Sequence, residues 1–231
     1  STEDVTKNYD VTTVDGTLTI RNATITGSVK ITGQAIYGEI LTAEVTTVPA
    51  DCTLTYQWYM QRGQQRQTIT GATNKTLELG ADQIGKVISV IVLASKDNYN
   101  TKSLTDMTDA STNGSSTVLQ KDLSSPDIIT TISPETFIYT GAEKKPSVEI
   151  YDGETLLVEN TDYTVSYANN INVGDATSTN PPTVTITGKG NYKGTITKYF
   201  AITNATITGS VTITGTNTFG ETLTASVTTV P

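Results

Sequence analysis

The side chains that could perform chemistry in this chain are carboxylates, amides, hydroxyls and tyrosines, because its 231 residues include no histidine. Without histidine the chain lacks the commonest general base, the usual transition-metal ligand and the usual catalytic triad. A single cysteine, Cys52, leaves no internal disulfide framework. We therefore expect no catalytic, cofactor-binding or metal-binding residues, no cofactor and no enzyme activity in this segment.

Oxygen ligands for calcium are one remaining possibility. Asp106, Asp109 and Asn113 offer such oxygens, but their spacing differs from the EF-hand loop, and acidic linkers are common. Asp152-Gly153-Glu154 is more simply explained as a hairpin turn than as a site.

Tyrosines on a sandwich surface can bind sugars by stacking on the sugar face. The candidates are Tyr59, Tyr99, Tyr139 and Tyr192, although their Gly-Asn-Tyr and Tyr-Thr-Gly contexts favour packing roles. Asn-x-Thr/Ser triplets, the N-glycosylation pattern, begin at Asn22, Asn74, Asn113 and Asn204, and in a Thr-rich chain such triplets arise by chance. Trp58 is expected to lie in a core.

The net charge of −8 and the pI near 4.5 exclude two classes of partner. Nucleic acid phosphates and anionic lipids both require a basic face. The apolar run from Val87 to Ala94 is far shorter than the roughly 20 residues that span a bilayer. We therefore expect neither nucleic-acid binding nor membrane insertion here.

A long internal repeat organises the chain. Residues 23–49 return at 205–231, shifted by 182 positions, and 20 of the 27 aligned residues are identical. This spacing is too long for one solenoid repeat and suits tandem β-sandwich domains. The segment therefore has the character of a piece of a longer repetitive protein.

Alternating apolar residues predict strands throughout. In 39–48, Leu41, Ala43 and Val45 share one face, and in 54–60 Leu54, Tyr56, Trp58 and Met60 do so. The run 87–94 is apolar on both faces, as in a central strand covered on each side. Gly27 and Gly33 predict bulges or bends in the first strand. No window shows helical periodicity, so the predicted fold class is all-β, with antiparallel sandwiches.

Residues 23–100 resemble the immunoglobulin-like repeats of Gram-positive bacterial surface proteins. The resemblance rests on G-x-x-L-T-A-x-V, L-T-Y-Q-W-Y and I-x-G-A-T, in that order, and on the corner from Leu77 to Gly85. It implies a sandwich with Trp58 buried in its core.

Residues 127–203 resemble a second bacterial surface repeat, also a β-sandwich. The motifs are Y-T-G followed by K-P, then T-D-Y-T-V-S-Y-A-N-N and I-T-G-K-G-N-Y-K-G-T. Residues 178–182 are an apparent insertion relative to that family, and a protruding loop is expected there.

These observations predict five segments. They are 1–22, the end of a preceding sandwich with a hairpin signal at Asp15-Gly16; 23–109, immunoglobulin-like module A; 110–126, a linker or closing strand; 127–203, immunoglobulin-like module B; and 204–231, the first strands of a second module A. The closing strand of module A lies either at 102–107 or at 116–119, and the sequence leaves both open.

The resemblance implies an extracellular structural protein, a spacer or assembly segment of a repetitive bacterial cell-surface protein of adhesin-stalk or surface-layer type. The alternative is a displayed module that binds a glycan or a host protein. Expected partners are neighbouring repeats of the same protein and other copies arranged head-to-tail. Because two strands alone are marginal in water, we expect the terminal segments to pack on module A or B, or to complete a sandwich supplied by another copy.

Overall fold

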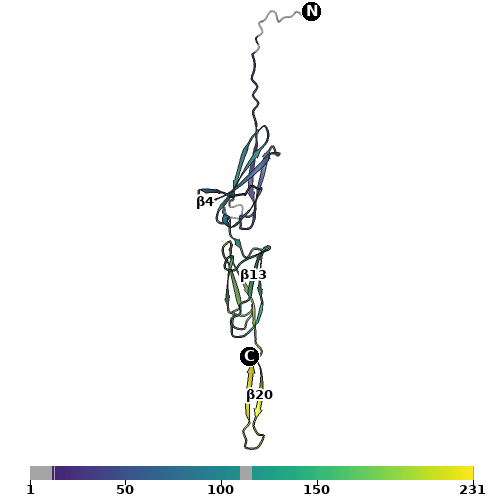
Figure 1. Ribbon diagram of the computed structural model, residues 1–231, viewed down its shortest axis with the longest axis vertical. Coiled ribbons are helices and arrows are strands. Elements are labelled where there is room, and N and C mark those ends of the chain that lie inside the picture. Colours follow the sequence, from purple (N-terminus) through teal and green to yellow (C-terminus); the bar gives the residue numbers. More distant parts are fainter. Residues whose placement is uncertain (1–11, 13, 110–115, 231) are drawn as a thin grey trace, which may run out of the picture. The chain divides into compact units, whose positions relative to one another are not determined.

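The computed structural model describes residue 12, residues 14–109 and residues 116–230, and in these the chain is all-β. Antiparallel sheets dominate, as the alternating sequence predicts, and the 3-10 turn η2 (Ala81–Gln83) is the one helical element among the residues described. The structure has two compact units, which Figure 1 shows in successive colours. Unit 1 comprises 1–35, 39–78 and 85–117; unit 2 comprises 36–38, 79–84 and 118–231.

Unit 1 contains two antiparallel sheets. The first has the order β2–β3–β6 and the second the order β5–β4–β7–β9, while β1 pairs with β8 in parallel. The strands are β1 (Ala23–Thr24), β2 (Thr26–Thr32), β3 (Ile40–Val48), β4 (Thr53–Arg62), β5 (Gln65–Thr68), β6 (Thr76–Glu78), β7 (Val87–Ser95), β8 (Tyr99–Asn100) and β9 (Lys102–Met107).

The core of unit 1 uses the inward residues of both sheets. Leu41 and Ala43 of β3 are fully buried, as are Trp58 of β4 and the alternate residues 88, 90, 92 and 94 of β7. The indole nitrogen Nε1 of Trp58 donates to the carbonyl of Asn74 at 2.9 Å, so its one polar atom is satisfied. The predicted burial of Trp58 is confirmed. β7 is a central strand as expected, but Leu93 on its other face is 45% exposed, so that face is only partly covered.

Unit 2 contains two three-stranded antiparallel sheets, β11–β13–β14 and β15–β16–β18, and two short parallel pairs, β10·β17 and β12·β19. The strands are β10 (Lys121–Asp122), β11 (Ile128–Ser133), β12 (Thr136–Ile138), β13 (Ser147–Asp152), β14 (Thr155–Leu156), β15 (Tyr163–Ala168), β16 (Thr183–Gly188), β17 (Tyr192–Lys193), β18 (Thr195–Tyr199) and β19 (Ala201–Thr203). Its hydrophobic core cluster consists of Leu123, Ile132, Ile150, Leu157, Tyr163, Val184, Ile186, Tyr192, Phe200 and Ile202.

The C-terminal part of unit 2 is a separate antiparallel hairpin, β20 (Thr208–Thr214) with β21 (Thr224–Val230). It is drawn in yellow in Figure 1. Among the strands that the structure describes, β20 and β21 pair only with each other, and every residue in them is exposed.

The structure decides between the two closing strands left open by the sequence. β9 pairs antiparallel with β7 over Lys102–Met107, so it closes the larger sheet of unit 1. Residues 118 and 119 instead make isolated bridges, Val118 with Ile84 and Leu119 with Ile36, within unit 2. Of the segment predicted as a linker or closing strand, 110–126, residues 110–115 lie outside the described residues, while Lys121–Asp122 form β10 of unit 2.

Two local expectations differ from the structure. Residues 14–22 form no strand, because alternation alone does not hold a strand without a sheet to join. β2 continues through Gly27, which pairs with Thr47 without a bulge. Glycine is needed there for another reason: a Cβ would lie 2.1 Å from the carbonyl oxygen of Thr46. The expected bend does occur at Gly33, which follows β2 with φ of +108°.

Candidate functional site

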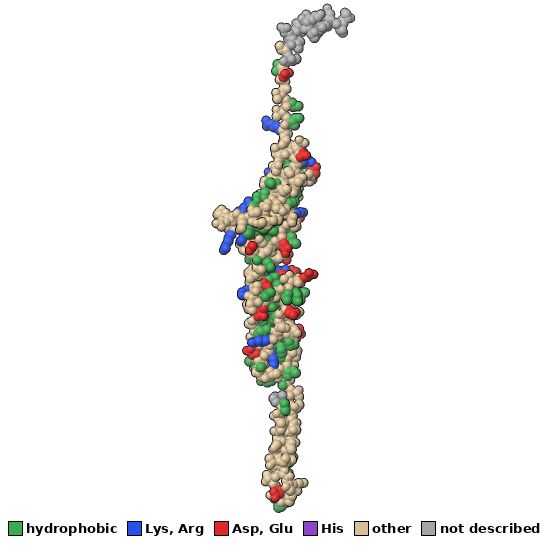
Figure 2. Space-filling view, in the orientation of Figure 1, with side chains coloured by type: hydrophobic (Ala, Val, Ile, Leu, Met, Phe, Trp, Pro, Cys, Tyr) green, Lys and Arg blue, Asp and Glu red, His purple; other side chains and the backbone are tan. Residues whose placement is uncertain are grey.

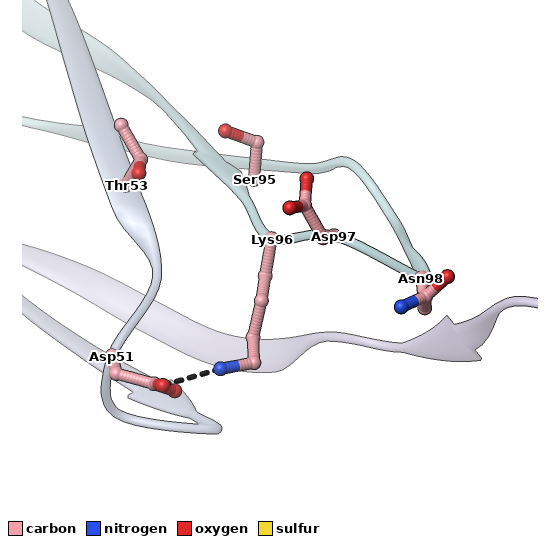
Figure 3. Close-up of a pocket in the computed structure, with 6 residues that line it drawn as sticks. All are labelled: Asp51, Thr53, Ser95, Lys96, Asp97 and Asn98. Atoms are coloured by element: carbon pink, nitrogen blue, oxygen red, sulfur yellow. Dashed lines mark hydrogen bonds and ion pairs between the residues drawn. The ribbon is translucent and has the colours of Figure 1, made fainter.

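One polar hollow lies at an end of the β4–β7 strand pair in unit 1, with a volume of about 540 Å³. Its lining residues are Asp51, Thr53, Ser95, Lys96, Asp97 and Asn98. Figure 3 shows the Lys96 ammonium directed at the Asp51 carboxylate, with which it forms an ion pair. This hydrogen bond lowers the pKa of Asp51 and raises the pKa of Lys96. The one lysine in the hollow is therefore protonated and already paired, so it offers no nucleophile.

A second polar cluster is buried in unit 2 around Lys121. The ammonium Nζ lies 2.7 Å from Oδ1 of Asp152 and 3.2 Å from Oδ2 of Asp127, and the lysine side chain is 8% exposed. Burial opposes the charge, but the hydrogen bonds to Asp152 and Asp127 prevail and raise the pKa of Lys121. This cluster joins the start of unit 2 to its β13–β14 turn.

Tyr192 completes the cluster. Its hydroxyl donates to Oδ2 of Asp152 at 3.0 Å, and its ring packs edge-on against Tyr37 with centroids 5.6 Å apart. Burial, together with the neighbouring Asp152, raises the pKa of Tyr192 far above its ordinary value. Both carboxylate oxygens of Asp152 thus accept hydrogen bonds from buried donors, so Asp152 has a structural role.

Of the calcium candidates, Asp106 has a structural role. Oδ2 of Asp106 accepts the backbone N–H of Ile31 at 2.6 Å, which ties β9 to β2. Asp109 has a partner of its own, and Asn113 lies outside the described residues. Among the described residues, no group of three or more acidic or cysteine side chains could hold a metal ion.

The other candidates have mainly structural surroundings. Residues 152–155 form the predicted turn between β13 and β14. The ring of Tyr59 lies under the guanidinium of Arg66 at 3.8 Å, and Tyr192 is only 4% exposed. Tyr99 belongs to β8, and Tyr139, which is 38% exposed, follows β12. The three described triplet asparagines, Asn22, Asn74 and Asn204, are all exposed.

Sequence reasoning missed Lys121, although a signal was present. Lys121 lies two positions from both Leu119 and Leu123, so in an alternating segment the three side chains share one face. Leu123 is 1% exposed, so this face points inward. A charge at such a position requires a buried partner.

The most unusual surface is the hairpin β20·β21. Its apolar side chains are well exposed: Val211 63%, Ile213 65%, Leu223 53% and Val227 66%. Figure 2 shows almost no charged side chains along these strands. The hairpin thus exposes a row of apolar side chains, with no charged residue on either strand.

Comparison with known proteins does not assign this chain to a family. Neither a scan against protein-family models nor a search of curated proteins found a match to this chain. Within the described residues, no helix is both long and apolar enough to cross a membrane.

Proposed function

We propose that this chain is a structural spacer and assembly segment of a repetitive bacterial cell-surface protein, located outside the cell and without catalytic activity. The carrying observation is the internal repeat, which forms the same hairpin twice. Thr26 pairs with Val48 in β2·β3, and Thr208 pairs with Val230 in β20·β21, an offset of 182 residues in each strand. A chain that repeats a structural element in the same register builds length by reusing modules.

The use of the polar groups supports this proposal. Lys121, Asp152 and Tyr192 bind one another, Asp106 holds a backbone N–H, and Lys96 is paired with Asp51. Each of these contacts stabilises a strand end or a turn. The motifs that resemble Gram-positive surface repeats, and the acidic composition with one cysteine, support the extracellular location.

Surface labelling tests the location and the role together. Antibodies raised against this chain should label intact cells of the source bacterium without permeabilisation. Beads coated with the chain should show no saturable binding to glycans or host-protein coats. Labelling that requires permeabilised cells, or a robust enzymatic turnover lost on one point substitution, would contradict the proposal.

A binding module for a glycan or host protein is the second candidate, and one surface favours it. Ile129 of β11 and Leu156 of β14 are both paired with Tyr151 of β13, which lies between them. Ile129 is 59% and Leu156 52% exposed, so an apolar row crosses the sheet. Saturable binding that is lost in Ile129→Ser and Leu156→Ser, but retained in Thr131→Ser on β11, would favour this function over the spacer.

A further inference from the structure

We propose that the apolar face of the β20·β21 hairpin is a docking surface for one partner, a second β5–β4–β7–β9 sheet with the sequence found in unit 1. This inference rests on the proposed assembly function and names the partner of its terminal hairpin.

The first copy of the hairpin shows what covers this face. In β2·β3, Val29 is 8%, Ile31 6%, and Leu41 and Ala43 0% exposed. The other sheet of the same unit contributes Trp58, Val90 and Val92, each 0% exposed. The hydrogen bond from Ile31 N–H to Asp106 of β9 joins the two sheets directly. The partner of this hairpin face is therefore the β5–β4–β7–β9 sheet.

The second copy retains the buried face without change. The residues equivalent to Val29, Ile31, Leu41 and Ala43 are Val211, Ile213, Leu223 and Ala225. Within the aligned strand residues, the copies differ at only three positions, Lys30/Thr212, Ile40/Thr222 and Glu44/Ser226. All three positions are exposed in unit 1. The substitutions thus spare the side chains that contact the partner sheet.

The copies also share their backbone constraints. A Cβ on Gly33 would lie 2.4 Å from the carbonyl of Ile40, and one on Gly215 would lie 2.5 Å from that of Thr222. The connecting loop is where the copies diverge, because buried Ala35 corresponds to Asn217. The hairpin is thus preformed in the docking geometry, and docking requires little ordering of its backbone.

The sheet of unit 1 itself is not available to the second hairpin, because β2·β3 already covers it. A tethered hairpin has an effective concentration in the millimolar range, which exceeds that of a free chain in solution. The partner must therefore be a sheet that lacks its own hairpin. The driving force is the burial of four apolar side chains. Val211, Ile213 and Leu223 are each more than half exposed, and the fourth is the smaller, exposed Ala225.

The test extends the full chain with a second copy of residues 50–119 directly after Pro231, which is equivalent to Pro49. Hydrogen exchange of the β20 and β21 amides is measured by mass spectrometry with and without the extension. Docking should slow their exchange by at least about 100-fold, towards the rates of β2 and β3.

Two variants of the extended chain make the test specific. Val211→Asp with Ile213→Asp should abolish the protection, and since both side chains are exposed, unit 1 and the β10–β19 strands of unit 2 keep their folds. Thr212→Lys with Ser226→Glu restores the outer residues of the first copy and should leave the protection intact. Equal exchange with and without the extension, or protection that survives the aspartates, would overturn the proposal. Surface labelling of cells is unaffected by this result, so failure of the docking and failure of the spacer function remain distinguishable.

Discussion

At the scale of single residues, Trp58 shows how the chain uses its largest side chain. The indole is 0% exposed and donates to the carbonyl of Asn74, so it fills the core and anchors the 69–74 loop. Trp58→Ala should destabilise unit 1 by about 3–5 kcal/mol, because the cavity and the unpaired carbonyl both cost free energy. Urea unfolding measures the change. Leu93→Ala, on an exposed position of β7, is the control and should stay within about 0.5 kcal/mol.

Lys121 is the second decisive residue. Lys121→Met keeps the aliphatic stem but removes the charge between Asp152 and Asp127. We expect a loss of about 3 kcal/mol, the low end of the range for a broken buried pair, since Asp127 is half exposed. Thermal or urea unfolding at neutral pH measures it, and an unchanged stability would show that the ion pair contributes nothing net.

The pH dependence provides an independent prediction. The pKa of Lys121 in the folded state is raised above its ordinary value of 10.5. The ionic stabilisation is therefore fully present below pH 10.5 and is lost as the pH rises through the folded-state pKa. The raised pKa of Tyr192 acts in the same direction, because burial disfavours the phenolate. The difference in unfolding free energy between wild type and Lys121→Met should shrink at alkaline pH; a constant difference from pH 7 to pH 12 would contradict the assignment.

These residues differ in how far the sequence predicts them. Trp58 lies in an alternating apolar segment, and local pattern alone places it inward. The role of Lys121 depends on Asp152 and Tyr192, which are 31 and 71 positions away, so the alternation can indicate its burial but not its partners. The same limit applies to Asp106, whose carboxylate bonds to a residue 75 positions earlier.

At the scale of elements, β3, β4 and β7 follow directly from period-two alternation. The choice of β9 over 116–119 as the closing strand does not, because both segments are short and mix polar with apolar residues, so that only their partners distinguish them. Residues 14–22 show the limit of alternation alone, since they alternate in sequence but form no strand in the structure. The immunoglobulin-like assignment itself rests on motifs and remains a prediction.

Gly33 offers a test of the repeated hairpin. Its φ of +108° and the close approach of the Ile40 carbonyl leave no room for a side chain. Gly33→Ala should destabilise unit 1 by about 1–3 kcal/mol from backbone strain, with more from the steric contact. Gly63→Ala is the matched control: its φ is +58° but nothing lies within 4 Å of the added Cβ, so it should cost only about 1 kcal/mol. Equal losses in urea unfolding would show that the carbonyl contact has no role.

At the scale of the whole molecule, each unit joins an early segment to a late one by parallel pairing. Ala23 pairs with Tyr99 in unit 1, and Lys121 with Tyr192 and Phe137 with Ile202 in unit 2. When the ends of a unit are pulled apart, two parallel strands slide along each other and their hydrogen bonds bear the load together. An antiparallel pair pulled from its open end instead breaks one bond at a time. Such resistance to stretching is what the proposed spacer function requires.

Single-molecule stretching of the full chain by its two ends tests this property. We expect two unfolding steps, one for β1–β9 (residues 23–107) and one for β10–β19 (residues 121–203). Each step should lengthen the chain by roughly 25 nm, since about 85 residues at about 3.4 Å per residue extend to about 29 nm, and the folded strands already span a few nanometres of this. Ala201→Pro removes the backbone N–H that donates to Glu135 at 2.8 Å in the β12·β19 contact. It should lower the force of one step, or abolish that step, and leave the other unchanged. Ala201→Ser keeps the N–H and should retain both forces, because unfolding under load reports the barrier to breaking the parallel contact. A proline that weakens both steps equally would show that the units do not resist force independently, and a proline without effect would show that β12·β19 does not bear the load.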